Sequence, residues 1–160
     1  MRTLILYGTK YGCTEKIAKT LSEKLKGEVE IFNLINNFDV SNLEKYDAIV
    51  IGGPVYVGMI NKEVSLFASK HEDILKEKKL GLFISCMGDE DMVKTQLNKA
   101  FPDILLEKAV AIENFGGAFR LKKMKFMDRL ITRFIAKTKH DKTNIIEKNI
   151  DRFVQLLQES

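Results

Sequence analysis

Two short runs of almost purely apolar residues, 48–53 and 80–86, constrain the fold of this chain most strongly. Neither run alternates apolar with polar residues, as a strand with one solvated face would. Continuous apolar runs of this length are typical of strands that are covered on both faces. Such strands occur in parallel sheets with helices packed on each side. The two runs therefore predict an α/β protein.

The rest of the sequence alternates between strand-like and helix-like patterns. Apolar periodicity predicts strands at 2–7, 28–33, 48–53, 80–86 and 109–115, helices at 14–26, 60–76 and 90–100, a short capped helical turn at 41–45, and a helical tail from about 125 with a break near 138–143. This order predicts a doubly wound, five-stranded parallel sheet with helices on both faces. A length of 160 residues with 45% hydrophobic residues suits one domain over residues 1–160.

The turn after the first predicted strand is typical of a phosphate site. Its residues are Thr9, Lys10, Tyr11, Gly12, Cys13 and Thr14. A turn that leads from a strand directly into a helix aims the helix N-terminus, free backbone N–H groups and two threonine hydroxyls at one point. These groups bind a phosphate without a cation. The pattern is neither a P-loop nor a dinucleotide-binding glycine motif. The structural alternative is a helix capped by Thr14.

Two further loops follow the third and fourth predicted strands. The first contains Pro54, Val55, Tyr56, Val57 and Gly58, and the second contains Ser85, Cys86, Met87, Gly88 and Asp89. Ligands of doubly wound sheets bind at the carboxyl ends of the strands, where these loops and the phosphate turn lie. Tyr56 and Met87 suit the faces of a planar ring, and backbone N–H groups at 87–90 suit its carbonyl edge. We therefore expect a ligand that has both a phosphate and a flat ring.

The three loops together resemble the FMN site of the flavodoxin-like family, and the resemblance extends over the whole chain. Thr9, Gly12 and Thr14 are in register with that family's Thr-x-Thr-Gly-x-Thr phosphate motif, whereas Tyr11 and Cys13 depart from it. The resemblance implies the sheet order 2-1-3-4-5 and FMN as the cofactor. It also implies that residues 9–14 bind the phosphate and that residues 54–58 and 85–90 bind the isoalloxazine ring, with Tyr56 stacked on it.

A narrower resemblance is to the branch that contains the menaquinone-dependent protoporphyrinogen IX dehydrogenases. It is carried by TLILYGTKYGCTEKIA, by IGGPVYVG, and by GGAFRLKKMKFMDRLITRFIAKT, which includes Gly117-Ala118-Phe119-Arg120 and Phe126-Met127-Asp128-Arg129. That branch has a long insertion before the fifth strand, whereas only about 22 residues separate Cys86 from Lys108 here. Two functions therefore stay open. One is an FMN-dependent dehydrogenase of the protoporphyrinogen type with a quinone acceptor, and the other is a one-electron flavodoxin carrier for an intracellular partner protein.

Positive charge is concentrated in one segment of the chain. Residues 120–139 contain eight basic residues and one acidic residue, a charge of +7, so the remaining chain carries −3 of the total of +4. Such a segment is suited to an anionic small substrate, an acidic redox partner or an anionic membrane surface. Nucleic acid is not expected, because stacking platforms and a recognition motif are missing.

The two cysteines, Cys13 and Cys86, both lie in the predicted flavin loops. Their spacing fits no metal site, and no side chain outside the loops is predicted to be catalytic. The sequence leaves open whether these thiols fill space or respond to redox state. The sequence has no membrane-spanning run and no signal-peptide cleavage site, so we expect a cytoplasmic protein. The alternative is a cytoplasmic protein that attaches peripherally to the inner face of the membrane.

Overall fold

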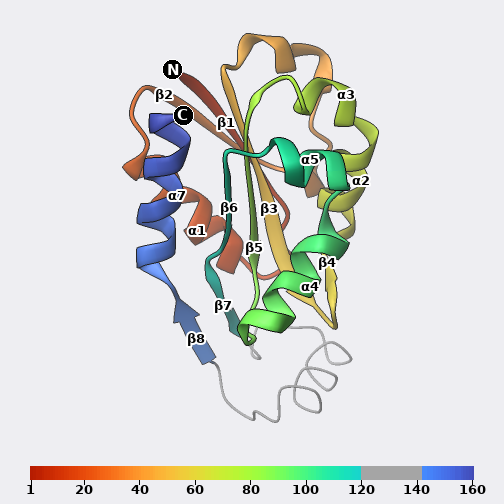
Figure 1. Cartoon of the computed structure of the whole chain (residues 1–160), viewed down its shortest axis with the longest axis vertical. Coiled ribbons are helices and arrows are strands. Elements are labelled where there is room, and N and C mark those ends of the chain that lie inside the picture. Colours follow the sequence, from red (N-terminus) through yellow and green to blue (C-terminus); the bar gives the residue numbers. More distant parts are fainter. Residues whose placement is uncertain (120–141) are drawn as a thin grey trace.

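The protein is built on a five-stranded parallel sheet (Figure 1), as the sequence predicts. The structure, a computed structural model, describes residues 1–119 and 142–160. The five strands are β1 (Arg2–Tyr7), β2 (Glu28–Asn33), β3 (Ala48–Tyr56), β5 (Lys79–Ser85) and β6 (Ala111–Asn114). They lie in the order β2-β1-β3-β5-β6 and all neighbours are parallel. This is the predicted order 2-1-3-4-5, so the flavodoxin-like fold is confirmed.

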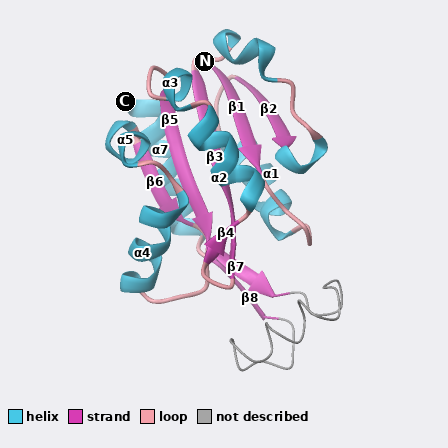
Figure 2. Ribbon diagram, turned by 90° about the vertical axis from the view of Figure 1, so that its right-hand side faces the viewer, coloured by secondary structure: helices cyan, strands magenta, loops and turns pink. Residues whose placement is uncertain are grey.

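Helices cover both faces of the sheet (Figure 2). The helices are α1 (Cys13–Lys24) and α7 (Glu147–Glu159) on one face, and α2 (Lys62–Lys70), α3 (Glu72–Leu75), α4 (Glu90–Ala100) and α5 (Asp103–Lys108) on the other; the 3-10 helices η1 (Leu34–Asn36) and η2 (Val40–Lys45) precede β3. Alternate residues of β3 enter the two cores: Val50 packs with α1 and α7, and Ile49 packs with α2 and α3. The strand is buried on both faces because both faces are covered.

Several predicted boundaries are wrong. The helix expected at 60–76 is interrupted at His71, which ends α2 and precedes α3. The short helix α5 lies in a stretch for which no element was predicted, and β6 is shorter than the strand expected at 109–115. Of the helical tail expected from about 125, residues 125–141 lie outside the described residues. In the described part, residues 142–145 form a strand, which was not predicted, and the expected C-terminal helix is present as α7. Part of the break expected at 138–143 also lies outside the described residues.

A two-stranded antiparallel ribbon leaves the main sheet after β6. It consists of β7 (Gly116–Phe119) and β8 (Lys142–Ile145), which pair from Gly116 with Ile145 to Phe119 with Lys142. Gly116 has a φ of +72°, and a Cβ atom there would lie 1.9 Å from the carbonyl oxygen of Asn144. Only glycine allows the two backbones to approach this closely. The ribbon lies at the end of the molecule where the strands of the sheet finish (Figure 1).

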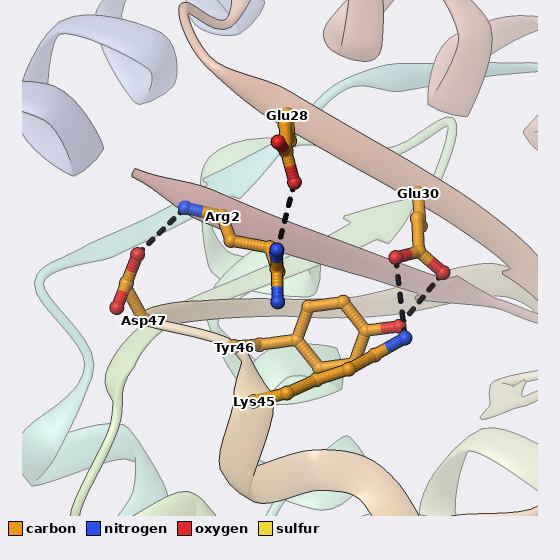
Figure 3. Close-up of polar contacts among 6 residues, drawn as sticks. All are labelled: Arg2, Glu28, Glu30, Lys45, Tyr46 and Asp47. Carbon is orange, nitrogen blue, oxygen red and sulfur yellow. Dashed lines mark hydrogen bonds and ion pairs between the residues drawn. The ribbon is translucent and has the colours of Figure 1, made fainter.

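At the opposite, amino-terminal edge of the sheet, ion pairs and hydrogen bonds form a network (Figure 3). Arg2 Nε lies 2.9 Å from Glu28 Oε2, and the backbone N–H of Arg2 donates to Asp47 Oδ2 at 2.7 Å. Glu30 accepts from the Tyr46 hydroxyl at 2.9 Å and from Lys45 Nζ at 3.3 Å. An open hollow of about 450 Å³ lies at this edge. Because the charged groups there bond to one another, they join the starts of β1, β2 and β3.

Candidate functional site

The turn after β1 has the geometry of an anion-binding turn. Gly12 has a φ of +82°, a left-handed conformation that favours glycine, and α1 begins at the next residue. The Gly12 N–H donates to Thr9 Oγ1 at 3.0 Å, so the hydroxyl proton of Thr9 stays available to a ligand. Lys10 is exposed, and Tyr11 and Cys13 are partly buried. The turn therefore directs the first N–H groups of α1 to the end of the sheet.

Thr14 lies in the first turn of α1 and is fully buried. Its Oγ1 atom has no hydrogen-bond partner among the described residues. The interpretation of Thr14 as the cap of α1 is wrong, since Gly12 occupies that position and no side chain caps the helix. A buried hydroxyl without a partner costs about 1–3 kcal/mol. A phosphate oxygen accepts from such a hydroxyl and from the helix N–H groups, so the turn fits the phosphate of FMN.

Residues 54–58 do not form the predicted loop. β3 continues to Tyr56 and pairs with β4 (Met59–Ile60), so that Val55 faces Ile60 and Tyr56 faces Met59. The connecting turn is Val57-Gly58, with φ values of +51° and +72°. Two positive φ values in a two-residue connection are typical of a type I′ hairpin turn. Pro54 and Tyr56 are partly buried, whereas Val57 is 48% exposed.

The segment after β5 is anchored by the side chain of Asn114. Asn114 Oδ1 accepts from the N–H groups of Cys86, at 3.0 Å, and Gly116, at 3.1 Å. Asn114 Nδ2 donates to the carbonyl of Cys86 at 3.0 Å, and Ser85 Oγ donates to the carbonyl of Gly116 at 2.7 Å. The backbone of Cys86 and the hydroxyl of Ser85 are thus bonded within the protein.

The remaining predicted residues of this segment divide into two roles. Asp89 caps the N-terminus of α4, because its Oδ1 accepts from the Met92 N–H at 2.8 Å. Met87 is partly buried and Gly88 is exposed. A Cβ atom on Gly117 would lie 3.0 Å from Met87 Cγ, so the backbone of β7 lies against this methionine. That Met87 and Gly88 meet a ligand stays a prediction.

The two cysteines differ in environment. Cys86 is buried, and burial raises the pKa of its thiol. A raised pKa keeps the thiol protonated and unreactive at neutral pH, which favours the space-filling interpretation for this residue. Cys13 is the first residue of α1 and is partly buried. Neither residue forms a disulfide.

The three predicted segments meet at one edge of the sheet. β1, β3 and β5 are neighbours, and Pro54 is in register with Ser85. The Gly8 N–H donates to the carbonyl of Gly52 at 3.2 Å, which joins the start of the phosphate turn to β3. We call this end of the sheet the carboxyl edge. It is the topological switch point, where doubly wound sheets bind their ligands.

Three residues of the carboxyl edge were missed from the sequence: Asn61, Asn114 and Asn149. Asn149 Nδ2 donates to the carbonyl of Asn114 at 2.8 Å and so extends the network around Cys86. Asn114 is the last residue of β6 and lies near the end of the strand predicted at 109–115, and a lone asparagine there was the available signal. In residues 1–119 and 142–160, no cluster of metal-binding side chains occurs and no helix is long and apolar enough to cross a membrane.

Known proteins share this sequence pattern and fold. The sequence matches the Flavodoxin domain family over residues 4–145. It is 28% identical to a flavodoxin of Clostridium saccharobutylicum over an alignment of 127 residues, and the match covers 74% of this chain and 76% of that protein. It is 24% identical to the protoporphyrinogen IX dehydrogenase (quinone) of Escherichia coli strain K12 over an alignment of 152 residues, and the match covers 90% of this chain and 83% of the relative.

A solved flavoprotein of Lactobacillus acidophilus in complex with FMN has the same fold. Its TM-score is 0.55 at 18% identity, over 71% of this chain and 92% of that chain. At this identity the likeness concerns the fold, whereas the family match rests on the sequence itself. The sheet order, the phosphate turn and the family match lead to one conclusion: the chain belongs to the flavodoxin family of FMN-binding redox proteins.

Proposed function

We propose that this flavodoxin-family protein is an FMN-dependent dehydrogenase that oxidises a reduced substrate of the protoporphyrinogen type and passes the electrons to a quinone. The observation that carries the proposal is the extent of the match to the Escherichia coli dehydrogenase. A match over 90% of the chain leaves about 16 of the 160 residues outside it. The family match, over residues 4–145, spans the basic segment 120–139 that follows the last strand of the main sheet.

The site residues of the proposal come from the three segments of the carboxyl edge. Thr9, Thr14 and the first N–H groups of α1 bind the phosphate, and Gly12 gives the turn the conformation that this requires. Tyr56 and Met87 contact the ring, while Asn114 holds the segment that carries Met87. Bound FMN supplies the electron transfer itself, because it accepts and releases electrons singly or in pairs.

Acidic side chains near the site are expected to lower the reduction potential of bound FMN. Asp89 caps α4, and Glu90 and Asp91 lie in the first turn of that helix. Negative charge close to the ring disfavours added negative charge on it. The proposal therefore includes a reduction potential below that of free FMN.

The second candidate is a one-electron carrier that docks on a partner protein. It is favoured by the higher identity, 28%, to the Clostridium saccharobutylicum flavodoxin. A net charge of +4 suits an acidic partner in that case. The two candidates share the cofactor site and differ in what delivers and removes the electrons.

An anaerobic reductive titration of the FMN-loaded protein, followed by visible absorbance, separates the candidates. Bleaching of the flavin band in a single step, together with turnover of protoporphyrinogen IX with menadione as acceptor, supports the dehydrogenase. Bleaching in two separated steps without turnover supports the carrier. A protein that is folded by circular dichroism but does not bind FMN contradicts both.

A threonine variant tests the phosphate site in the same preparation. Thr14→Val keeps the shape of the side chain and removes its hydroxyl. We expect about tenfold weaker binding of FMN and unchanged binding of riboflavin, which lacks the phosphate. Thr20→Val, at a partly buried position two turns further along α1, is the matched control and leaves both affinities unchanged. If Thr14→Val weakens the binding of FMN and of riboflavin equally, Thr14 does not contact the phosphate.

A quinone acceptor brings a membrane surface into the proposal. The basic segment 120–139 lies outside the described residues, and its charge of +7 is known from the sequence. Near an anionic surface each basic residue contributes on the order of 1 kcal/mol, so the proposal includes peripheral attachment of a cytoplasmic protein at the inner face of the membrane. Co-sedimentation with phosphatidylglycerol vesicles but not with phosphatidylcholine vesicles is the expected result.

A further inference from the structure

Asn61 lies between the two segments that the proposed function assigns to phosphate and ring. It follows β4 and precedes α2, and its backbone N–H donates to the carbonyl of Pro54 at 3.0 Å. Its carboxamide reaches the end of β1, since a Cβ atom on Gly8 would lie 2.3 Å from Asn61 Oδ1. Gly8 directly precedes the phosphate turn. The carboxamide is thus at the junction of the phosphate turn and the β3–β4 hairpin.

The Oδ1 atom of Asn61 has no hydrogen-bond donor among the described residues, although it is buried. An asparagine at this position ordinarily caps the following helix by accepting from one of its first N–H groups. Asn61 makes no such side-chain bond, and the N–H groups of Val64 and Ser65 donate instead to its backbone carbonyl. A buried hydrogen-bond acceptor that lacks this local partner and any other partner lowers the stability of the fold.

The chemistry of this oxygen restricts what it binds. A carboxamide oxygen accepts hydrogen bonds and donates none, so it repels a phosphate oxygen and requires a hydroxyl or an N–H group. Thr14 Oγ1, the other unpartnered side-chain oxygen beside this turn, is a hydroxyl and donates. The two atoms therefore suit different parts of one ligand. In FMN the stretch between phosphate and ring is a ribityl chain with three hydroxyl groups.

We propose that Asn61 Oδ1 accepts a hydrogen bond from a ribityl hydroxyl of the bound flavin. This inference rests on the proposed function, because it takes the flavin site as given. It assigns Asn61 to recognition of the sugar-alcohol chain, separately from phosphate binding by the turn and from ring binding by the hairpin.

Three flavins dissect the contact: lumiflavin has only the ring, riboflavin adds the ribityl chain, and FMN adds the phosphate. Their dissociation constants are measured by quenching of flavin fluorescence. Asn61→Leu keeps the branched shape and removes the acceptor. We expect riboflavin and FMN to bind about five- to tenfold more weakly, by the same factor, and lumiflavin to bind as it does to the wild type.

Two further variants keep the test decisive. Asn61→Asp retains an acceptor oxygen in the same shape and is expected to bind riboflavin within about twofold of the wild type. Asn98→Ala, at an exposed asparagine of α4, is expected to change none of the three affinities. The urea midpoint of cofactor-free Asn61→Leu is expected to equal or exceed that of the wild type, because the lost oxygen has no partner to lose.

Each contrary result overturns the inference in its own way. If Asn61→Leu weakens the binding of FMN alone, Asn61 contacts the phosphate. If it also weakens the binding of lumiflavin, Asn61 contacts the ring or supports the hairpin. Unchanged affinities, or a lower urea midpoint of the cofactor-free variant, show that the oxygen serves the protein alone. If the wild type binds none of the three flavins, the proposed function itself has failed, which is distinct from these results.

Discussion

Removal of the Asn114 side chain is expected to be one of the most damaging single changes near the cofactor site. Asn114 is 8% exposed, and its carboxamide makes hydrogen bonds to the N–H and carbonyl of Cys86 and to the N–H of Gly116. Each such bond contributes about 0.5–1.5 kcal/mol, and a buried group left without a partner costs about 1–3 kcal/mol. For Asn114→Ala we expect a loss of about 3–5 kcal/mol in the free energy of unfolding.

Equilibrium unfolding in urea measures this loss. With a denaturant dependence of about 2 kcal/mol per M, the midpoint is expected to fall by about 2 M while the slope stays unchanged. Such a loss is a large part of the about 5–15 kcal/mol that stabilises a domain. Asn149→Ala is the matched control, because it removes the one bond from Asn149 Nδ2 to the carbonyl of Asn114 and is expected to cost about 1 kcal/mol.

Asn114→Asp separates the bonds that the side chain accepts from the bond that it donates. A carboxylate still accepts from the N–H groups of Cys86 and Gly116, but it loses the donor to the carbonyl of Cys86 and places a negative oxygen against it. An intermediate midpoint is expected. A shift below about 0.5 M for Asn114→Ala, or one equal to that of Asn149→Ala, would refute the reasoning.

Two smaller changes test other features of the structure. Val57→Gly is expected to raise the free energy of unfolding by about 1–2 kcal/mol, seen as a higher urea midpoint, because a β-branched residue is strained at a φ of +51°; a lower midpoint contradicts the left-handed conformation. Burial holds the pKa of His71 below its usual value of 6.5, so its unfolded form binds the proton first and stability is lost as pH falls below that value. His71→Gln is expected to flatten the thermal midpoint between about pH 7 and 5, and an unchanged pH profile contradicts this.

The sheet was predictable from sequence because its signal is local. The apolar runs at 48–53 and 80–86 report burial on both faces, and the structure shows both strands covered. The apolar pattern of each strand spans only a few residues. The helices that connect the strands then allow only a few possible strand orders in the sheet. The turn from β1 into α1 was likewise visible in six consecutive residues, and its binding of phosphate stays a prediction.

The features that were missed depend on contacts between distant residues. Val57-Gly58 carries no Asn-Gly or Asp-Gly signal, so its hairpin turn was expected as an open loop. Gly116 pairs with Ile145, and Asn114 bonds to Cys86, across separations that no local pattern reports. Asn61 follows a strand of only two residues, and its unpaired oxygen is evident only when Gly8 and β4 are placed in space.

The β7–β8 ribbon has a consequence for how proteins of this design can vary. Phe119 and Lys142 are paired, so the chain leaves and re-enters the described fold at neighbouring points beside the carboxyl edge. The ends of the intervening sequence are therefore held together by backbone hydrogen bonds, whatever its length. Lengthening a connection whose ends are already fixed costs little, since closure entropy rises only with the logarithm of length. The connection between β7 and β8 is therefore a position at which one sequence can replace another beside an unchanged cofactor site.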